Sequence, residues 1–217
     1  MPLPRLHLVT DDAVLANDDF GDVAEAVLDR CRDLAVLHVR GPATGGARVH
    51  AIATRMHAAA LDTGTILVVN DRVDIAMAVH AHGVQLGSRS LLITDARALL
   101  GAAALIGSSV HGVAEAVEAE SDGADFVIQG TIFASPSHPG RAAAGIALVR
   151  ETAERVGVPV IAIGGITPPR VADVAAAGAD GVAVLGGVWH AADPVAAVDE
   201  YVDRIRRAWQ QPNGRTR

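Results

Sequence analysis

Residues 159–189 read PVIAIGGITPPRVADVAAAGADGVAVLGGVW, and this stretch decides the fold of the chain. It opens with the apolar run Val160–Ile163, which predicts a short buried strand. Thr167 and the prolines after it favour the start of a helix, which we expect over Pro169–Ala177. A second apolar strand is expected over Val182–Leu185. The stretch is therefore a strand–helix–strand unit in which a pair of glycines follows each strand.

The two glycine pairs are Gly164 with Gly165 and Gly186 with Gly187. Because glycine has no Cβ, the backbone can approach a ligand closely there, and its amides can converge on an anion. Such amides, late in a chain of alternating strands and helices, match the phosphate site of a (β/α)8 barrel. The four glycines are therefore candidate phosphate-binding residues. The alternative that they only form tight turns stays open at this point.

The same alternation of apolar runs and helical patterns extends over the whole chain. We expect strands at Leu6–Val9, Val36–Arg40, Ile66–Val69, Val84–Leu86, Leu105–Gly107, Phe126–Gln129, Val160–Ile163 and Val182–Leu185. We expect helices at Val23–Arg32, Arg48–Leu61, Arg72–Val79, Thr94–Leu100, Val113–Ala119, Ile146–Val156, Pro169–Ala177 and Pro194–Trp209. Strict alternation is typical of a parallel sheet, and repeated units without a change in composition favour a closed barrel. The predicted fold is a single (β/α)8 TIM barrel over residues 1–209, followed by a polar C-terminal tail over residues 210–217.

Composition and charge narrow the partners that we expect. Of the 217 residues, 50% are hydrophobic, and the formal net charge is −7. Because no basic run is present, nucleic acid is not an expected partner. No apolar stretch reaches transmembrane length, and the first ten residues lack a signal-peptide pattern, so we expect a cytoplasmic protein with no membrane association. The single cysteine, Cys31, fits a reducing compartment.

The chain contains no lysine, since all 18 of its basic residues are arginine. A lysine Schiff base is therefore excluded, and with it the lysine-dependent aldolases and the pyridoxal-phosphate enzymes, both of which use barrels. No cluster of cysteine and histidine exists in the sequence, so a dedicated zinc site is not expected either.

Loops that follow the strands carry the chemistry in a barrel of this kind. The candidate substrate-binding side chains at these strand ends are His38, Arg40, Asn70, Asp71, Gln85, Ser109, Gln129 and Thr131. His111, after the fifth strand, is the candidate acid–base group, because histidine accepts and donates protons near neutral pH. The longest polar loop, Ser135–Arg141, has the composition of a segment that closes over a ligand.

Structural alternatives stay open for several of these candidates. Arg40 could be a surface arginine, and His38 could be a packed core imidazole. Asn70 and Asp71 could cap the helix that follows them, since both residue types suit that position. A histidine at the position of His111 is often structural.

An ordered set of motifs runs through nearly the whole chain. It comprises Arg40, NDRVDIA (70–76), GVQLGS (83–88), IGSSVH (106–111), GADFVIQGTIF (123–133), PVIAIGGITP (159–168) and GADGVAVLGGV (178–188). In combination, these motifs resemble the superfamily of thiamin phosphate synthase and the TenI-type thiazole tautomerases. The resemblance implies a single (β/α)8 barrel that binds a thiazole phosphate, and it implies a homodimer.

By resemblance, the synthase branch joins a pyrimidine diphosphate to the thiazole phosphate and neutralises the departing diphosphate with Mg²⁺, aspartates and lysines. The second-strand motif here reads HVRGP (38–42) and lacks the usual lysine. The acidic position after the fourth strand is Ser90, and the loop that grips the diphosphate begins SPSH at Ser135. Asp71 remains, but one carboxylate alone is a poor magnesium site. Gly186 replaces a common serine. These departures favour the tautomerase branch, with neither a metal nor a cofactor.

SVH (109–111) resembles the tautomerase motif whose histidine is the acid–base residue. The leading interpretation is thus a thiazole tautomerase in which His111 moves a proton of a 2-carboxy-4-methylthiazole phosphate, with aromatisation as the driving force. Arg40 is expected to hold the substrate carboxylate. Two alternatives remain: a thiamin phosphate synthase with a degenerate metal site, and a non-catalytic protein that binds a thiazole phosphate.

Overall fold

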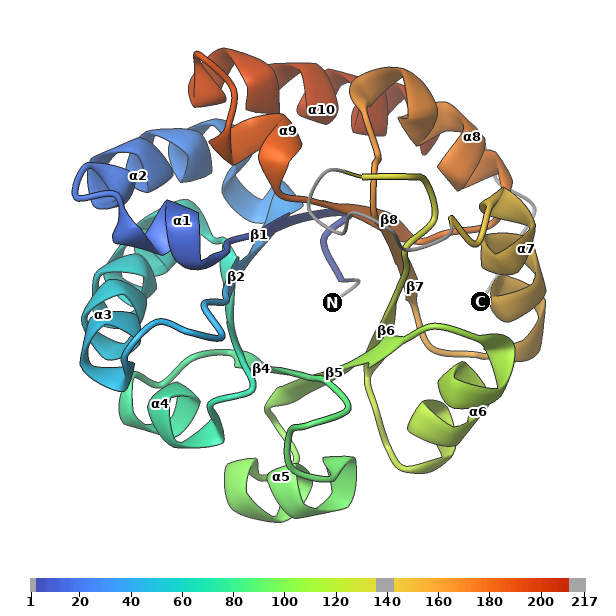
Figure 1. Cartoon of the computed structure of the whole chain (residues 1–217), viewed down its shortest axis with the longest axis horizontal. Helices are drawn as coiled ribbons and strands as arrows, with labels where there is room; N and C mark the ends of the chain where they lie inside the picture. Colours follow the sequence, from blue (N-terminus) through green and yellow to red (C-terminus); the bar gives the residue numbers. More distant parts are fainter. Residues whose placement is uncertain (1–2, 136–142, 211–217) are drawn as a thin grey trace.

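Eight parallel strands close into a barrel in the computed structural model, which describes residues 3–135 and 143–210. Each strand pairs with its neighbours in chain order, and the last pairs with the first (Figure 1). The strands are β1 Leu6–Val9, β2 Ala35–Val39, β3 Ile66–Asn70, β4 Gly83–Leu86, β5 Leu105–Val110, β6 Phe126–Gln129, β7 Val160–Ile163 and β8 Gly181–Val184. The predicted (β/α)8 barrel is confirmed.

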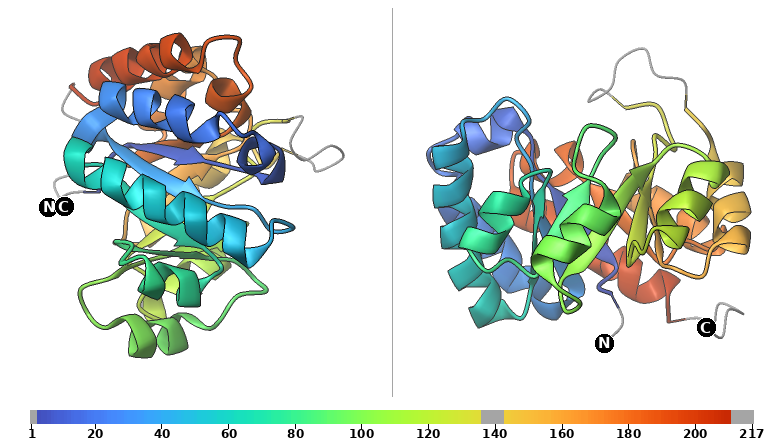
Figure 2. Two further views of the ribbon diagram at one scale, coloured as in Figure 1. Left: turned by 90° about the vertical axis from the view of Figure 1, so that its left-hand side faces the viewer. Right: turned by 90° about the horizontal axis from the view of Figure 1, so that it is seen from below.

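Helices surround the barrel on all sides, as the two side views of Figure 2 also show. The α-helices are α1 Asp12–Ala16, α2 Phe20–Cys31, α3 Gly46–Thr63, α4 Val73–Ala78, α5 Ile93–Leu100, α6 Val113–Ser121, α7 Ile146–Arg155, α8 Val171–Ala176, α9 Gly186–Trp189 and α10 Pro194–Ala208. Two short 3₁₀ helices, η1 Arg32–Leu34 and η2 Pro168–Arg170, precede β2 and α8. Among the residues described, no helix combines the length and the apolar character needed to cross a bilayer.

Several element boundaries differ from the sequence-based expectation. Helices α1 and α9 were not expected, and each begins within three residues of a strand end. Because α9 starts at Gly186 and Leu185 is its N-cap, β8 ends at Val184, before the expected Leu185. Arg40 lies one residue past the end of β2 rather than within it. The expected polar tail lies outside the described residues beyond Gln210.

Two apolar layers form the core. Inside the barrel, one cluster contains Val9, Phe126, Ile128, Ile161 and Ala183, and another contains Val36, Ile66 and Val68. The alternate residues of the same strands face the helices in a larger cluster, so each strand is buried on both faces. This double burial explains why the strand sequences are continuous apolar runs. It also leaves the strand ends as the places where polar side chains concentrate.

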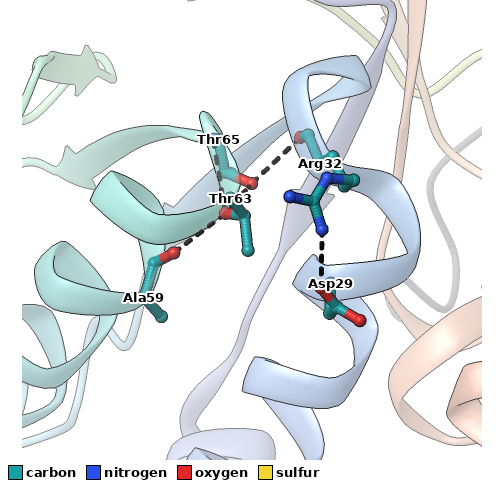
Figure 3. A network of polar contacts seen from close by, with 5 residues as sticks. All are labelled: Asp29, Arg32, Ala59, Thr63 and Thr65. Atoms are coloured by element: carbon teal, nitrogen blue, oxygen red, sulfur yellow. Dashed lines mark hydrogen bonds and ion pairs between the residues drawn. The ribbon is translucent and has the colours of Figure 1, made fainter.

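The turn from α2 into β2 is joined to the end of α3 by a network of hydroxyl contacts (Figure 3). Thr65 Oγ1 donates to the Arg32 carbonyl at 3.0 Å, and Thr63 Oγ1 lies 2.8 Å from Thr65 Oγ1. Arg32 has a left-handed backbone with φ of 49° and forms an ion pair with Asp29. The network lies at the amino ends of β2 and β3. It therefore belongs to the stability face of the barrel, away from the carboxyl ends.

Candidate active site

Arg40 enters the carboxyl-end mouth of the barrel on a backbone that Thr10 holds in place. The buried Thr10 hydroxyl donates to the Arg40 carbonyl at 2.8 Å and accepts from the Arg40 amide at 2.8 Å. The Thr44 hydroxyl and, more weakly, the charge of Arg40 lower the pKa of Asp12. No described carboxylate forms an ion pair with Arg40. Its half-buried guanidinium is therefore available for an anionic ligand.

Asp71 and Ser90 meet where β3 and β4 end. Asp71 has a left-handed backbone with φ of 63°, and its amide donates to the Gln85 carbonyl at 2.9 Å. Ser90 Oγ donates to Asp71 Oδ1 and accepts from the Gly87 amide at 2.8 Å. A carboxylate and a hydroxyl thus lie in contact at the mouth, on loops that the backbone fixes.

Three acceptors on adjacent strands face the interior without a partner. His38 Nδ1, Asn70 Oδ1 and Gln85 Oε1 are buried atoms that form no hydrogen bond with a described residue. Gln85 Nε2 donates to Ser109 Oγ at 3.0 Å, so Ser109 joins this group from β5. Buried polar atoms usually have partners, and unpaired ones are found where a ligand or water completes them. The structure therefore brings His38, Asn70, Gln85 and Ser109 together below the mouth.

His38 does not stand alone, because His7 of β1 lies beside it. His7 Nδ1 is 2.8 Å from His38 Nε2, and His7 Nε2 is 3.1 Å from the Pro4 carbonyl oxygen. Burial lowers the pKa of His38 to about 3 and lowers the pKa of His7 well below its usual value. His7 was not among the residues expected from the sequence. The available signal was a histidine within an otherwise apolar strand, two residues before Val9.

His111 lies at the start of α6, with its side chain half-exposed. Its backbone amide donates to Glu115 Oε2 at 2.7 Å, and its ring Nδ1 is 3.3 Å from the same oxygen. Glu115 of α6 thus ties the residue before the N-cap Gly112 to the first turn of the helix. The contacts of His111 are local ones to α6.

Gln129 points away from the barrel interior. Its Nε2 donates to Thr152 Oγ1 of α7 at 2.7 Å, and both side chains are buried. The expectation that Gln129 lines the pocket is wrong, because its neighbours in alternation, Phe126 and Ile128, take the inward positions. Thr131, two residues on, is half-buried next to the first glycine pair, where a Cβ on Gly164 would lie 2.6 Å from Thr131 Cγ2.

Two features of the glycine pairs matter for a ligand: the hydrogen bonding of their amides and the space beside their Cα atoms. Among the described residues, no hydrogen bond is donated by the amides of Gly165, Gly186 or Gly187, which leaves these groups available for an anion. Packing also requires glycine at Gly165, where a Cβ would lie 2.5 Å from the Ala134 carbonyl. At Gly186 the nearest atom, His190 Nδ1, would be 3.2 Å from a Cβ, so this position has more room.

The loop expected to close over a ligand, Ser135–Arg141, lies outside the described residues beyond Ser135. Within the described ranges, no group of three or more His, Cys, Asp or Glu side chains is arranged to hold a metal ion.

The fold and the strand-end groups together define a (β/α)8 barrel with a candidate phosphate site. The chain belongs to the TMP-TENI family, described as thiamine monophosphate synthase, whose model matches residues 6–188. A thiamine-phosphate synthase of Methanoculleus marisnigri is 38% identical over 207 residues, covering 94% of this chain and 96% of the relative. The thiamine biosynthesis bifunctional protein ThiM/ThiE of Symbiobacterium thermophilum is 43% identical, and there the match spans 39% of the longer relative.

A solved structure supports the same relationship. Thiamine phosphate pyrophosphorylase from Pyrococcus furiosus superposes with a TM-score of 0.83 at 28% identity, over 94% of this chain and 96% of that one.

These comparisons overturn the leading interpretation from the sequence. Relatives with 31–39% identity over most of the chain are named thiamine-phosphate synthase, and none of these names mentions a tautomerase. The prediction of a thiazole tautomerase is therefore wrong. The acid–base role expected of His111 belonged to that reaction and is withdrawn with it.

Proposed function

We propose that this protein is a thiamine-phosphate synthase, a transferase that joins a pyrimidine diphosphate to a thiazole phosphate with release of diphosphate. The observation that carries the proposal is the close similarity to full-length proteins of that name. The geometry of the mouth supports it with polar groups on opposite sides. Asp71 and Ser90 follow β3 and β4, and the glycine amides follow β7 and β8, across the barrel (Figure 1).

Two anionic substrates need two anion sites, and we propose that both lie at the mouth. The free amides of Gly165, Gly186 and Gly187 suit the thiazole phosphate, because converging backbone N–H groups bind phosphate without a charged side chain. The diphosphate belongs on the opposite side, near Asp71. Arg40 lies between these sites, after β2, and its planar guanidinium suits an oxyanion in two-point contact.

Asp71 and Ser90 fit the Mg²⁺ that the family resemblance implies. Both offer oxygen, the donor that Mg²⁺ prefers, and they already contact each other. Mg²⁺ is usually held by one or two carboxylates together with water and substrate phosphates, so one carboxylate from the chain is sufficient when the substrate is a diphosphate. When bound, the ion would neutralise charge on the departing diphosphate. The expectation of no metal thus changes with the proposed reaction.

Because the chain has no lysine, arginine must supply the positive charge that the synthase branch otherwise takes from lysine. Arg40 is held on a fixed backbone and forms no ion pair with a described residue, which makes it the leading candidate. Asn70, Gln85, Ser109 and Thr131 are the further polar groups that we propose for substrate contact.

Displacement of diphosphate does not require a histidine base, so His111 is expected to be dispensable for turnover. His111→Asn keeps the backbone amide that Glu115 accepts from. We expect its coupling rate to stay within about twofold of the wild type, whereas loss of a general acid–base group costs about 10²–10⁴-fold. The measurement is steady-state formation of thiamine phosphate. A hundredfold loss of the coupling rate with unchanged thermal stability would show that His111 takes part in the reaction.

The experiment that tests the proposed function is direct coupling of the two substrates by the purified protein. We expect thiamine phosphate to form at a rate proportional to the protein concentration when Mg²⁺ is present. Binding of the thiazole phosphate without any coupling would instead favour a non-catalytic binding protein.

A further inference from the structure

The histidine pair inside the barrel has a role that the reaction itself does not explain. His7 and His38 are fully buried, their ring centroids are 5.0 Å apart, and both rings contact Phe126. Neither ring forms an ion pair with a described residue. Because an unpaired buried charge is costly, both imidazoles are neutral, and each therefore has one donor and one acceptor nitrogen.

The contacts of this pair determine which nitrogen carries each proton. The Pro4 carbonyl can only accept, so His7 Nε2, 3.1 Å away, carries the proton and donates it. His7 Nδ1 is then the acceptor. It lies 2.8 Å from His38 Nε2, which must therefore be the donor. His38 Nδ1 is left with a lone pair that no described residue satisfies with a hydrogen bond.

The group beside this lone pair is the side chain of Asn70. In the parallel register of β2 and β3, His38 is opposite Val68, two residues before Asn70, which places the Asn70 side chain next to the His38 ring. Asn70 Oδ1 is also buried and forms no hydrogen bond with a described residue. An amide oxygen that faces the His38 Nδ1 lone pair forms no hydrogen bond with it, because both atoms are acceptors. An amide N–H at the same place would donate a hydrogen bond to Nδ1. The oxygen and nitrogen of an amide have nearly the same shape, so hydrogen bonding decides which of them faces His38.

We infer that the buried His7–His38 pair positions the Asn70 amide, with its N–H toward His38 Nδ1 and its oxygen turned toward the substrate as an acceptor. His38 and His7 are thus positioning residues, and Asn70 is the group that contacts an N–H or O–H donor of the substrate. The part of this inference that concerns the substrate rests on the proposed function. The part that concerns the histidines does not.

Nitrogen NMR of the wild-type protein tests the proton positions without any substrate. Long-range ¹H–¹⁵N correlation on histidine-labelled protein at pH 7 distinguishes protonated from unprotonated ring nitrogens, and loss of the His38 signals in His38→Gln assigns them. We expect the proton on Nε2 in both rings and an unprotonated Nδ1 in His38. A proton on His38 Nδ1, or a doubly protonated ring in the pair, would overturn the inference.

Matched kinetics test the effect on the substrate. His38→Leu removes the acceptor for Asn70, and His38→Gln retains an acceptor oxygen of similar reach. Leaving one buried donor unpaired is expected to raise KM for the pyrimidine diphosphate about tenfold in His38→Leu, with His38→Gln within about threefold of the wild type. Equal KM values in the two variants, at matched thermal stability, would contradict the positioning role.

The two tests separate the inference from the proposed function. If the wild type does not couple the substrates, the proposed function fails while the NMR result still decides the proton positions. If His38→Leu does not fold, the wild-type spectrum remains the deciding measurement.

Discussion

Asp71→Asn is expected to lower the coupling rate by about 10²–10³-fold, because the charge stabilisation that a bound metal supplies is several kcal/mol and each 1.36 kcal/mol is a factor of ten. Asparagine keeps the size and one oxygen of the side chain but removes its negative charge. The hydrogen bond from the Asp71 amide to the Gln85 carbonyl involves only the backbone, so the loop should keep its conformation in this variant. The measurement is the initial rate of thiamine phosphate formation over a range of Mg²⁺ concentrations.

Two further variants make this result specific. Asp74→Asn is the matched control, because Asp74 is a nearby exposed carboxylate already paired with Arg72, and its coupling rate should change little. Ser90→Asp places a second carboxylate beside Asp71 and should lower the Mg²⁺ concentration that gives half-maximal rate. Equal coupling rates in Asp71→Asn and Asp74→Asn would show that Asp71 does not hold the metal. An unchanged Mg²⁺ requirement in Ser90→Asp would show that Ser90 does not lie at the metal site.

Gly165→Val is expected to destabilise the fold strongly, and not only to weaken phosphate binding. Gly165 has a positive φ of 61°, which a β-branched residue rarely adopts, and a Cβ would lie 2.5 Å from the Ala134 carbonyl and 2.9 Å from Phe133 Cβ. Strain of this kind costs about 1–3 kcal/mol for the backbone, and forced overpacking adds about 1–3 kcal/mol. Urea unfolding measures the sum.

Gly186→Ser is the control for the other glycine pair. Its backbone is not in the left-handed region, and its nearest neighbour is the edge of the His190 ring at 3.2 Å, so the free energy of unfolding should change little. The added hydroxyl should also strengthen binding of the thiazole phosphate, which calorimetry measures. If Gly165→Val were as stable as Gly186→Ser, the crowding at Gly165 would not be the reason for glycine there.

The barrel itself could be predicted because its strands are apolar on both faces and alternate with helical patterns throughout the chain. The same double burial explains the error at Gln129. In the run Phe126–Gln129 every residue is buried, so alternation does not reveal which of them face inward. Only the contact with Thr152 shows that Gln129 belongs to the layer between β6 and α7. The short helices α1 and α9 give too few residues for a periodic pattern.

The prediction of the tautomerase branch over the synthase branch was wrong for a chemical reason. Replacement of the second acidic position by Ser90 was interpreted as loss of the metal site, which assumes that the protein alone must coordinate the ion. Mg²⁺ commonly takes part of its coordination from substrate phosphates, so one missing carboxylate is weak evidence against it. The sequence also did not indicate that Ser90 Oγ contacts Asp71 across two loops, because register and loop geometry place them together.

His7 was missed because it lies within an apolar strand rather than at a strand end. Its contact with His38 follows from the parallel register of β1 and β2, in which Val9 is opposite His38. Spacing along the chain does not contain that information.

Diphosphate release by the wild-type protein is the decisive measurement for the proposed synthase reaction. The purified chain is mixed with the pyrimidine diphosphate and the thiazole phosphate, and free diphosphate and thiamine phosphate are measured together, with Mg²⁺ and with excess EDTA. We expect the two products to form in equal amounts with Mg²⁺, EDTA to stop the formation of both, and restored Mg²⁺ to recover it. Absence of both products with Mg²⁺, from folded protein that binds the thiazole phosphate, would contradict the proposed synthase reaction.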